Sequence, residues 1–160
     1  MGLADWLRVF RALHEKAKKG ELSGTDAEDY RAGCDELSRA LIAAQKLGLR
    51  PGEVPRRVLR VARAVQVTLE TKVSSVRTTT IDVSVAGFSV LLGKPPPPEE
   101  QTATLRLPGA EPLVVGVVPG EVRLQPGAVR AAFLFQRLSD PARERLEMLV
   151  IDTALSQLVG

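Results

Sequence analysis

The segment "PRRVLR", residues 55–60, concentrates side chains that could bind an anion. It contains Arg56, Arg57 and Arg60, and Arg63 follows three positions later. Arginine presents a planar fork of N–H donors, which fits phosphate oxygens and also matches O6 and N7 of guanine. A basic run of this kind can equally be ordinary solvated surface, so the rest of the chain has to decide between the two interpretations.

A second stretch, "IDVSVAG" at residues 81–87, supplies groups that complement those arginines. Asp82 and Ser84 are two positions apart, so both side chains of an extended strand project from one face. The apolar residues between them face the core, and we therefore expect this polar pair to stand outside it. A carboxylate there can accept the ring N–H and the exocyclic amine of guanine, while Gly87 lets the backbone bend or a ligand approach closely. The alternative is a simple turn at the end of a strand.

The first 50 residues have the periodicity of two helices. Apolar residues recur at steps of three and four at Leu3, Trp6, Phe10, Leu13 and Ala17, and again at Tyr30, Cys34, Leu37, Leu41 and Ala44. Thr25 and Glu28 form a capping box at the expected start of the second helix, and Gly48 is its expected end. We expect a helical hairpin over residues 1–50, which either packs on its neighbouring domain or pairs with a second copy or another partner.

Beyond Pro55 the apolar residues alternate with polar ones, which is the period of half-buried strands. Strands are expected at residues 65–69, 81–85, 88–92, 102–107, 113–124 and 129–136. Pro119 and Gly120 predict a bulge in the longest of them. A final helix is expected to begin with Asp140 as its cap and to lie over an open end of a barrel. Short strands in succession, without helices between them, favour an antiparallel sheet curled into a barrel.

Composition argues against several classes of function. The 160 residues carry 22 Lys and Arg against 19 Asp and Glu, an excess too small for the concentrated basic face of a protein that binds a nucleic-acid polymer. The single cysteine, Cys34, and the single histidine, His14, supply no credible soft-metal site. We expect His14 to be solvated. The carboxylates form no catalytic pattern, so we expect neither an enzyme nor a cofactor.

The location of the protein is also constrained by its sequence. A lone cysteine fits a reducing cytoplasm, and the charged N-terminus lacks the unbroken apolar stretch of a signal peptide. The apolar stretches are interrupted by polar residues well short of a membrane span. We expect a cytoplasmic protein with no membrane partner.

Taken together, the two motifs resemble those of the PilZ domain, a bacterial receptor module for cyclic di-GMP. The family's R-x-x-x-R motif is matched by Arg56 and Arg60, and its [D/N]-x-S-x-x-G motif by Asp82, Ser84 and Gly87. The resemblance implies a mainly β fold with α, namely a six-stranded antiparallel β-barrel with a C-terminal helix. It extends from roughly Val54 to Leu158, within the second of two expected domains (residues 51–160), and does not cover the helical hairpin of residues 1–50.

The resemblance also implies a role for each matched residue. Arg56 and Arg60 would hold phosphates and stack on or pair with guanine, Asp82 and Ser84 would hydrogen-bond a guanine base, and Gly87 would keep the surface open. The expected function is a receptor that binds cyclic di-GMP, without a cofactor, and signals to a protein partner. The alternative is an adaptor of the same fold that lacks useful nucleotide affinity.

The chain departs from the family pattern at two places. Family members commonly carry paired glycines where Ala86 precedes Gly87 here, and a glycine in the last strand where this chain has Ala131 and Ala132. The first change keeps the essential glycine, whereas the second would narrow the space beside the ligand.

Overall fold

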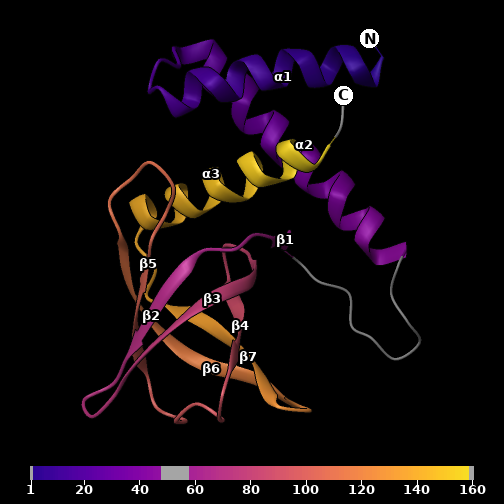
Figure 1. The fold of residues 1–160 in the computed structure, drawn as a ribbon. Coiled ribbons are helices and arrows are strands. Elements are labelled where there is room, and N and C mark those ends of the chain that lie inside the picture. The colour runs from indigo at the N-terminus through magenta and orange to yellow at the C-terminus, as the bar shows by residue number, and fades with distance from the viewer. Residues whose placement is uncertain (1, 48–57, 159–160) are drawn as a thin grey trace. The chain divides into compact units, whose positions relative to one another are not determined.

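The computed structural model describes residues 2–47 and 58–158 (Figure 1). Contacts divide them into two compact units: Arg60–Val150, and a second unit made from the residues before and after that segment. Arg60, Asp82, Ser84 and Gly87 all belong to the unit Arg60–Val150. Most of the motif residues can therefore be placed within one compact body.

That unit is an antiparallel β-barrel. Its strands are β1 (Val61–Ala62), β2 (Gln66–Glu70), β3 (Ser75–Val83), β4 (Gly87–Leu92), β5 (Gln101–Leu105), β6 (Leu113–Gln125) and β7 (Ala128–Gln136). Neighbours run in the order β3-β2-β5-β6-β7-β4, and pairing of β4 with β3 closes the ring, while the short β1 pairs with the last residues of β3. Figure 1 shows these strands curving round a common interior. The predicted six-stranded antiparallel barrel is confirmed.

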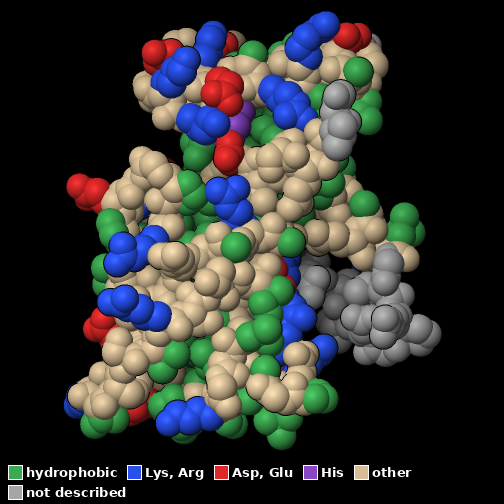
Figure 2. All heavy atoms as spheres, viewed as in Figure 1, with side chains coloured by type: hydrophobic (Ala, Val, Ile, Leu, Met, Phe, Trp, Pro, Cys, Tyr) green, Lys and Arg blue, Asp and Glu red, His purple; other side chains and the backbone are tan. Residues whose placement is uncertain are grey.

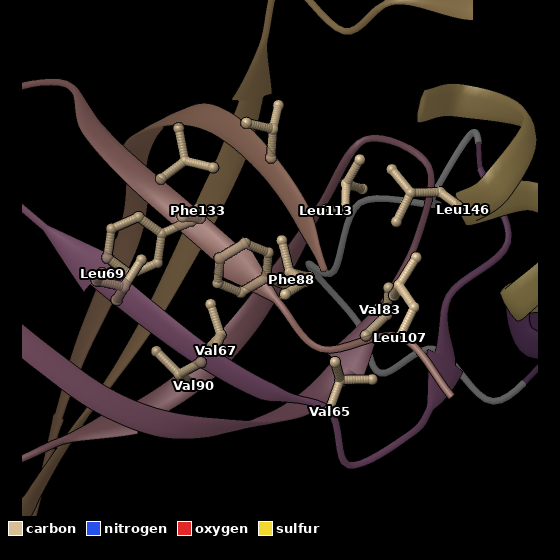
Figure 3. Close-up of a cluster of buried hydrophobic side chains, with 14 of the residues drawn as sticks. Val65, Val67, Leu69, Val83, Phe88, Val90, Leu107, Leu113, Phe133 and Leu146 are labelled. Atoms are coloured by element: carbon tan, nitrogen blue, oxygen red, sulfur yellow. The ribbon is translucent and has the colours of Figure 1, made fainter. Parts of the chain in front are cut away.

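The barrel interior is filled by the apolar residues of the alternating pattern (Figure 3). Val67 and Leu69 are buried on β2, and Val90 on β4 is fully buried. The rings of Phe88 and Phe133 stack with centroids 5.6 Å apart. Because alternate residues enter this core, the residues between them form the outer face, where the polar motif residues are found.

The structure tests two predicted local features, the bulge in β6 and the start of the C-terminal helix. The register of β6 against β7 shifts between Pro119 and Val122, which confirms the expected bulge. The C-terminal helix α3 (Asp140–Gln157) begins where predicted, but Ser139 is its cap. The Ser139 hydroxyl accepts the N–H of Ala142 at 3.3 Å, so Asp140 already lies in the first turn.

The other unit contains the predicted helices α1 (Leu3–Lys18) and α2 (Gly24–Leu47). Helix α2 starts one residue before Thr25, which therefore sits in its first turn and not at the predicted cap position. Phe10 and Leu37 are buried in this unit's own apolar cluster. Gly33 of α2 permits the contact, because a Cβ there would stand 2.5 Å from the Phe10 ring.

The expectation that His14 is solvated is wrong. His14 is only 2% exposed, and its Nδ1 lies 2.7 Å from the Tyr30 hydroxyl while Nε2 lies 2.9 Å from Asp152 Oδ1. Lys18 donates to the same carboxylate oxygen at 3.1 Å. Figure 2 shows the histidine, in purple, almost hidden between acidic and basic side chains. It lies four residues after Phe10, and so on the buried face of α1.

Candidate functional site

Asp82 is the centre of the candidate site. It lies near the end of β3, where its neighbour Val83 is fully buried in the barrel core. Alternation along the strand therefore turns the Asp82 side chain to the outer face, as the sequence predicted. The residue is nevertheless only 8% exposed, because other side chains on that face cover it.

Both carboxylate oxygens of Asp82 have hydrogen-bond donors. The Ser89 hydroxyl donates to Oδ1 at 2.8 Å. Arg60 Nη1 and Arg130 Nη2 donate to Oδ2 at 3.5 Å and 3.1 Å. The two arginine side chains are 32% and 35% exposed. The anion is thus paired with cations that remain in contact with solvent.

Strand β1 places Arg60, the last residue of the arginine motif, beside Asp82. Its two residues pair with the end of β3, in the register Val61 with Val83 and Ala62 with Asp82. Arg60 immediately precedes β1 and therefore reaches the carboxylate, although 22 positions separate the two residues in the chain. Of the predicted arginine pair, Arg56 lies outside the described residues.

The chain after β1 is anchored by Thr80 on β3. Its hydroxyl donates to the carbonyl of Arg63 at 2.5 Å and accepts the N–H of Val65 at 2.9 Å. These bonds fix the bend between β1 and β2. Arg63, the last arginine of the basic segment, contributes its backbone carbonyl to this anchor.

Ser84 lies beyond the end of the strand that carries Asp82, whereas the sequence predicted both residues on one strand. Strand β3 ends at Val83, and Ser84 starts the turn to β4. Its hydroxyl accepts the N–H groups of Ala86 and Gly87 at 3.1 and 3.2 Å, so it organises the turn. A serine that bonds to backbone two and three residues ahead stabilises such a turn. A contact of Ser84 with guanine stays a prediction.

Gly87 is required by the closure of the barrel. It is paired with Leu134 on β7, and a Cβ at this position would lie 2.0 Å from the carbonyl oxygen of Phe133. Only glycine fits so close to a neighbouring backbone. The sequence predicted that Gly87 keeps the surface open for a ligand. The structure adds a second reason, close packing against β7, which the sequence did not reveal.

Sequence reasoning missed Ser89 and Arg130 as neighbours of Asp82. Ser89 alternates with buried Phe88 and Val90, so its outward direction could have been read from the pattern. Arg130 alternates with buried residues in the same way. Its proximity to Asp82 depends on β4 pairing with both β3 and β7, which no local pattern specifies.

The same arginines also affect the pKa of a further acidic residue, Glu121. Glu121 on β6 accepts a hydrogen bond from Arg123 at 2.9 Å. That bond, together with attraction from Arg123, Arg60 and Arg130, lowers the pKa of the Glu121 carboxyl. The charges of Arg60 and Arg130 thus add a smaller contribution to that of Arg123 at this carboxyl.

This arrangement has the functional groups needed to recognise an anionic guanine nucleotide. A carboxylate can accept the two N–H groups on the guanine edge, and adjacent guanidinium groups can bind phosphate. Among the residues that the structure describes, no cluster of three or more His, Cys, Asp or Glu could hold a metal ion.

Comparison with known families decides the assignment. The profile of the PilZ domain matches residues 55–152. The chain belongs to the PilZ domain family. Among curated proteins, nothing matches it.

Solved PilZ structures share the fold at low identity. The Bacillus subtilis inhibitor of motility, MotI/DgrA, is 17% identical with a TM-score of 0.57, covering 66% of this chain and 54% of that one. Escherichia coli YcgR in complex with c-di-GMP is 15% identical with a TM-score of 0.54, covering 61% and 45%. The K. pneumonia MrkH–c-di-GMP complex is 16% identical with a TM-score of 0.53, covering 65% and 54%. This PilZ chain thus matches about half the length of each of these proteins.

Proposed function

We propose that this PilZ chain is a non-enzymatic receptor for cyclic di-GMP. The observation that carries the proposal is the pairing of Arg60 with Asp82, which brings the family's two sequence motifs to one point on the barrel surface. A base-accepting carboxylate and a phosphate-binding guanidinium are both needed for this ligand, and each alone would fit many others.

In the proposed complex, Asp82 accepts the N–H groups of a guanine base and Arg60 binds guanine or phosphate. Arg56, the first arginine of the motif, likewise binds guanine or phosphate. Ser84 and Gly87 shape the turn beside the base, and Ser84 adds a hydrogen bond to it. Guanine must replace donors that Asp82 already has, so recognition is an exchange of partners.

The proposed receptor works in the cytoplasm and signals through altered contacts with a protein partner. The helices α1 and α2 are the proposed contact region, and a second copy of the chain is one candidate partner. Exposed apolar side chains in this unit, including Leu3 and Val9, are available for such a contact.

The alternative function is an interaction adaptor without useful nucleotide affinity. One observation favours it: Asp82 already has three hydrogen-bond donors on its two oxygens. A ligand that displaces these donors gains less binding free energy than a ligand that binds an unpaired carboxylate.

Titration calorimetry with cyclic di-GMP tests the proposal, with GTP and cyclic di-AMP as controls. We expect a dissociation constant in the micromolar range or tighter, which corresponds to about −8 kcal/mol or better. Absence of heat at hundreds of micromolar ligand would favour the adaptor.

Matched variants test the assignment of the site. Arg60→Ala and Asp82→Asn should each weaken binding about fivefold to hundredfold, the effect of a lost base or phosphate contact of roughly 1–3 kcal/mol. Arg63→Ala removes the same charge nearby and should have much less effect. Equal losses in all three variants would mean general electrostatic attraction and would reject the assigned site.

A further inference from the structure

Arg130 makes the shorter of the two arginine contacts with Asp82. Its Nη2 lies 3.1 Å from Oδ2, compared with 3.5 Å for Arg60 Nη1. It comes from β7, 48 positions away in the sequence, and belongs to neither PilZ motif. Because Arg130 contacts Asp82, its contacts must change when a ligand binds to that carboxylate.

The three donors on Asp82 differ in how readily they can leave. Ser89 is only 2% exposed, so its hydroxyl has almost no contact with solvent that could replace the bond to Asp82. Arg60 and Arg130 each keep about a third of the side chain exposed, so either can turn outward without losing hydration of its charge. When a guanine edge binds Asp82, these arginines are the groups that move.

The charges of the ligand favour retention of the released arginine at the site. Arg60 and Arg130 both pair with Asp82, so the carboxylate keeps one cationic partner when the other arginine turns away. A cyclic dinucleotide carries two phosphate charges, and a guanidinium released beside it pairs with a phosphate oxygen in a charge-assisted hydrogen bond.

We propose that Arg130 is a third ligand-binding arginine, which pairs with Asp82 in the free protein and with a phosphate of the bound cyclic dinucleotide. This inference rests on the proposed function. It assigns to β7 a direct part in recognition, in addition to the segments that carry the two motifs.

The test compares Arg130→Ala, Arg130→Lys and Arg123→Ala with the wild-type protein by calorimetric titration of cyclic di-GMP at low and at moderate salt. Arg123 is the matched control, since it faces Arg130 in the β6–β7 register, is largely exposed and has Glu121 as a partner. Thermal unfolding of each variant shows whether the barrel is intact.

Arg130→Ala should weaken binding about tenfold to hundredfold, as expected for loss of a hydrogen bond to a charged group. Its affinity should also depend less on salt than that of the wild type, because one ionic contact is missing. Arg130→Lys should recover part of the loss, since it keeps the charge but not the fork. Arg123→Ala should change affinity less than threefold.

Two results would overturn the proposal, and they are distinguishable. If the wild type binds and Arg130→Ala binds equally well or more tightly, Arg130 only competes with the ligand for Asp82, while the receptor function stands. If the wild type does not bind, the receptor function fails and this inference fails with it.

Discussion

At the scale of single residues, the candidate site of this PilZ domain is centred on one carboxylate, which other side chains cover and also pair with. Asp82 faces away from the core and yet is 8% exposed, because Arg60, Arg130 and Ser89 surround it. An anion in such a place is tolerated only when it is paired and hydrogen-bonded. The contacts that cover Asp82 therefore also contribute to the stability of the barrel.

Asp82→Ala should lower the free energy of unfolding by about 1–3 kcal/mol, because the buried Ser89 hydroxyl loses its acceptor. The two arginines add little to this loss, since both can be hydrated. Chemical denaturation measures the effect. Asp82→Asn, which keeps an acceptor oxygen, should cost less. Equal stability of Asp82→Ala and the wild type would contradict the stabilising role of the Ser89 contact.

At the scale of secondary-structure elements, the site depends on how closely β4 approaches its neighbours. β4 pairs with β3 on one side and with β7 on the other. Its first residue, Gly87, sits against the backbone of β7, while Ser84 holds the turn that leads into it. The turn motif thus joins the strand that carries Asp82 to the strands that complete the barrel.

Gly87→Ala should destabilise the barrel by about 1–3 kcal/mol or more, because the added Cβ overlaps a backbone carbonyl that cannot turn aside. Gly93→Ala is the matched control, since a Cβ there meets nothing within 4 Å, and it should change stability by no more than about 0.5 kcal/mol. Denaturant unfolding of both variants provides the comparison. A stable Gly87→Ala barrel would contradict the packing argument.

The contacts of Asp152 with α1 predict how the helical unit responds to acid. Burial opposes ionisation of this carboxyl, but hydrogen bonds from His14 and Lys18 outweigh it and lower its pKa. A lowered pKa means that ionised Asp152 stabilises the folded state at neutral pH. That contribution is lost as the pH falls below about 4, through the lowered pKa.

Asp152→Asn should therefore be less stable than the wild type at pH 7, and the difference should shrink as the pH falls toward 3. Denaturant unfolding followed by circular dichroism at both pH values measures it. Asp35→Asn, at an exposed position on α2, is the control and should show no such trend. A difference that is unchanged by pH would mean that packing, and not ionisation, explains the effect of Asp152.

At the scale of the whole molecule, the described chain forms two apolar cores. Leu146 and Leu149 of α3 belong to the core of the barrel, whereas Ile151 and Leu155 of the same helix belong to the core with Phe10. The sequence predicted that this helix covers the barrel and did not show that its second half serves the helical unit. Within residues 2–47 and 58–158, no helix is long and apolar enough to cross a membrane.

Much of the fold and part of the site could be predicted from the sequence, because they depend on local patterns. Alternating apolar residues specify strands and the face that each strand buries. Pro119 and Gly120 specify a bulge, and two short motifs, Arg56 with Arg60 and Asp82 with Ser84 and Gly87, indicate the family. Each of these signals lies within a few neighbouring positions.

Only the tertiary structure decided which side chains meet. The alternation that turns Asp82 and Arg130 outward does not say that β4 lies between their strands, so the contact between them could not be predicted. The same limit explains His14, whose partner Asp152 comes from the other end of the chain. A local pattern fixes the face on which a side chain lies, whereas its neighbours depend on pairings between distant segments, which follow from the packing of the whole core.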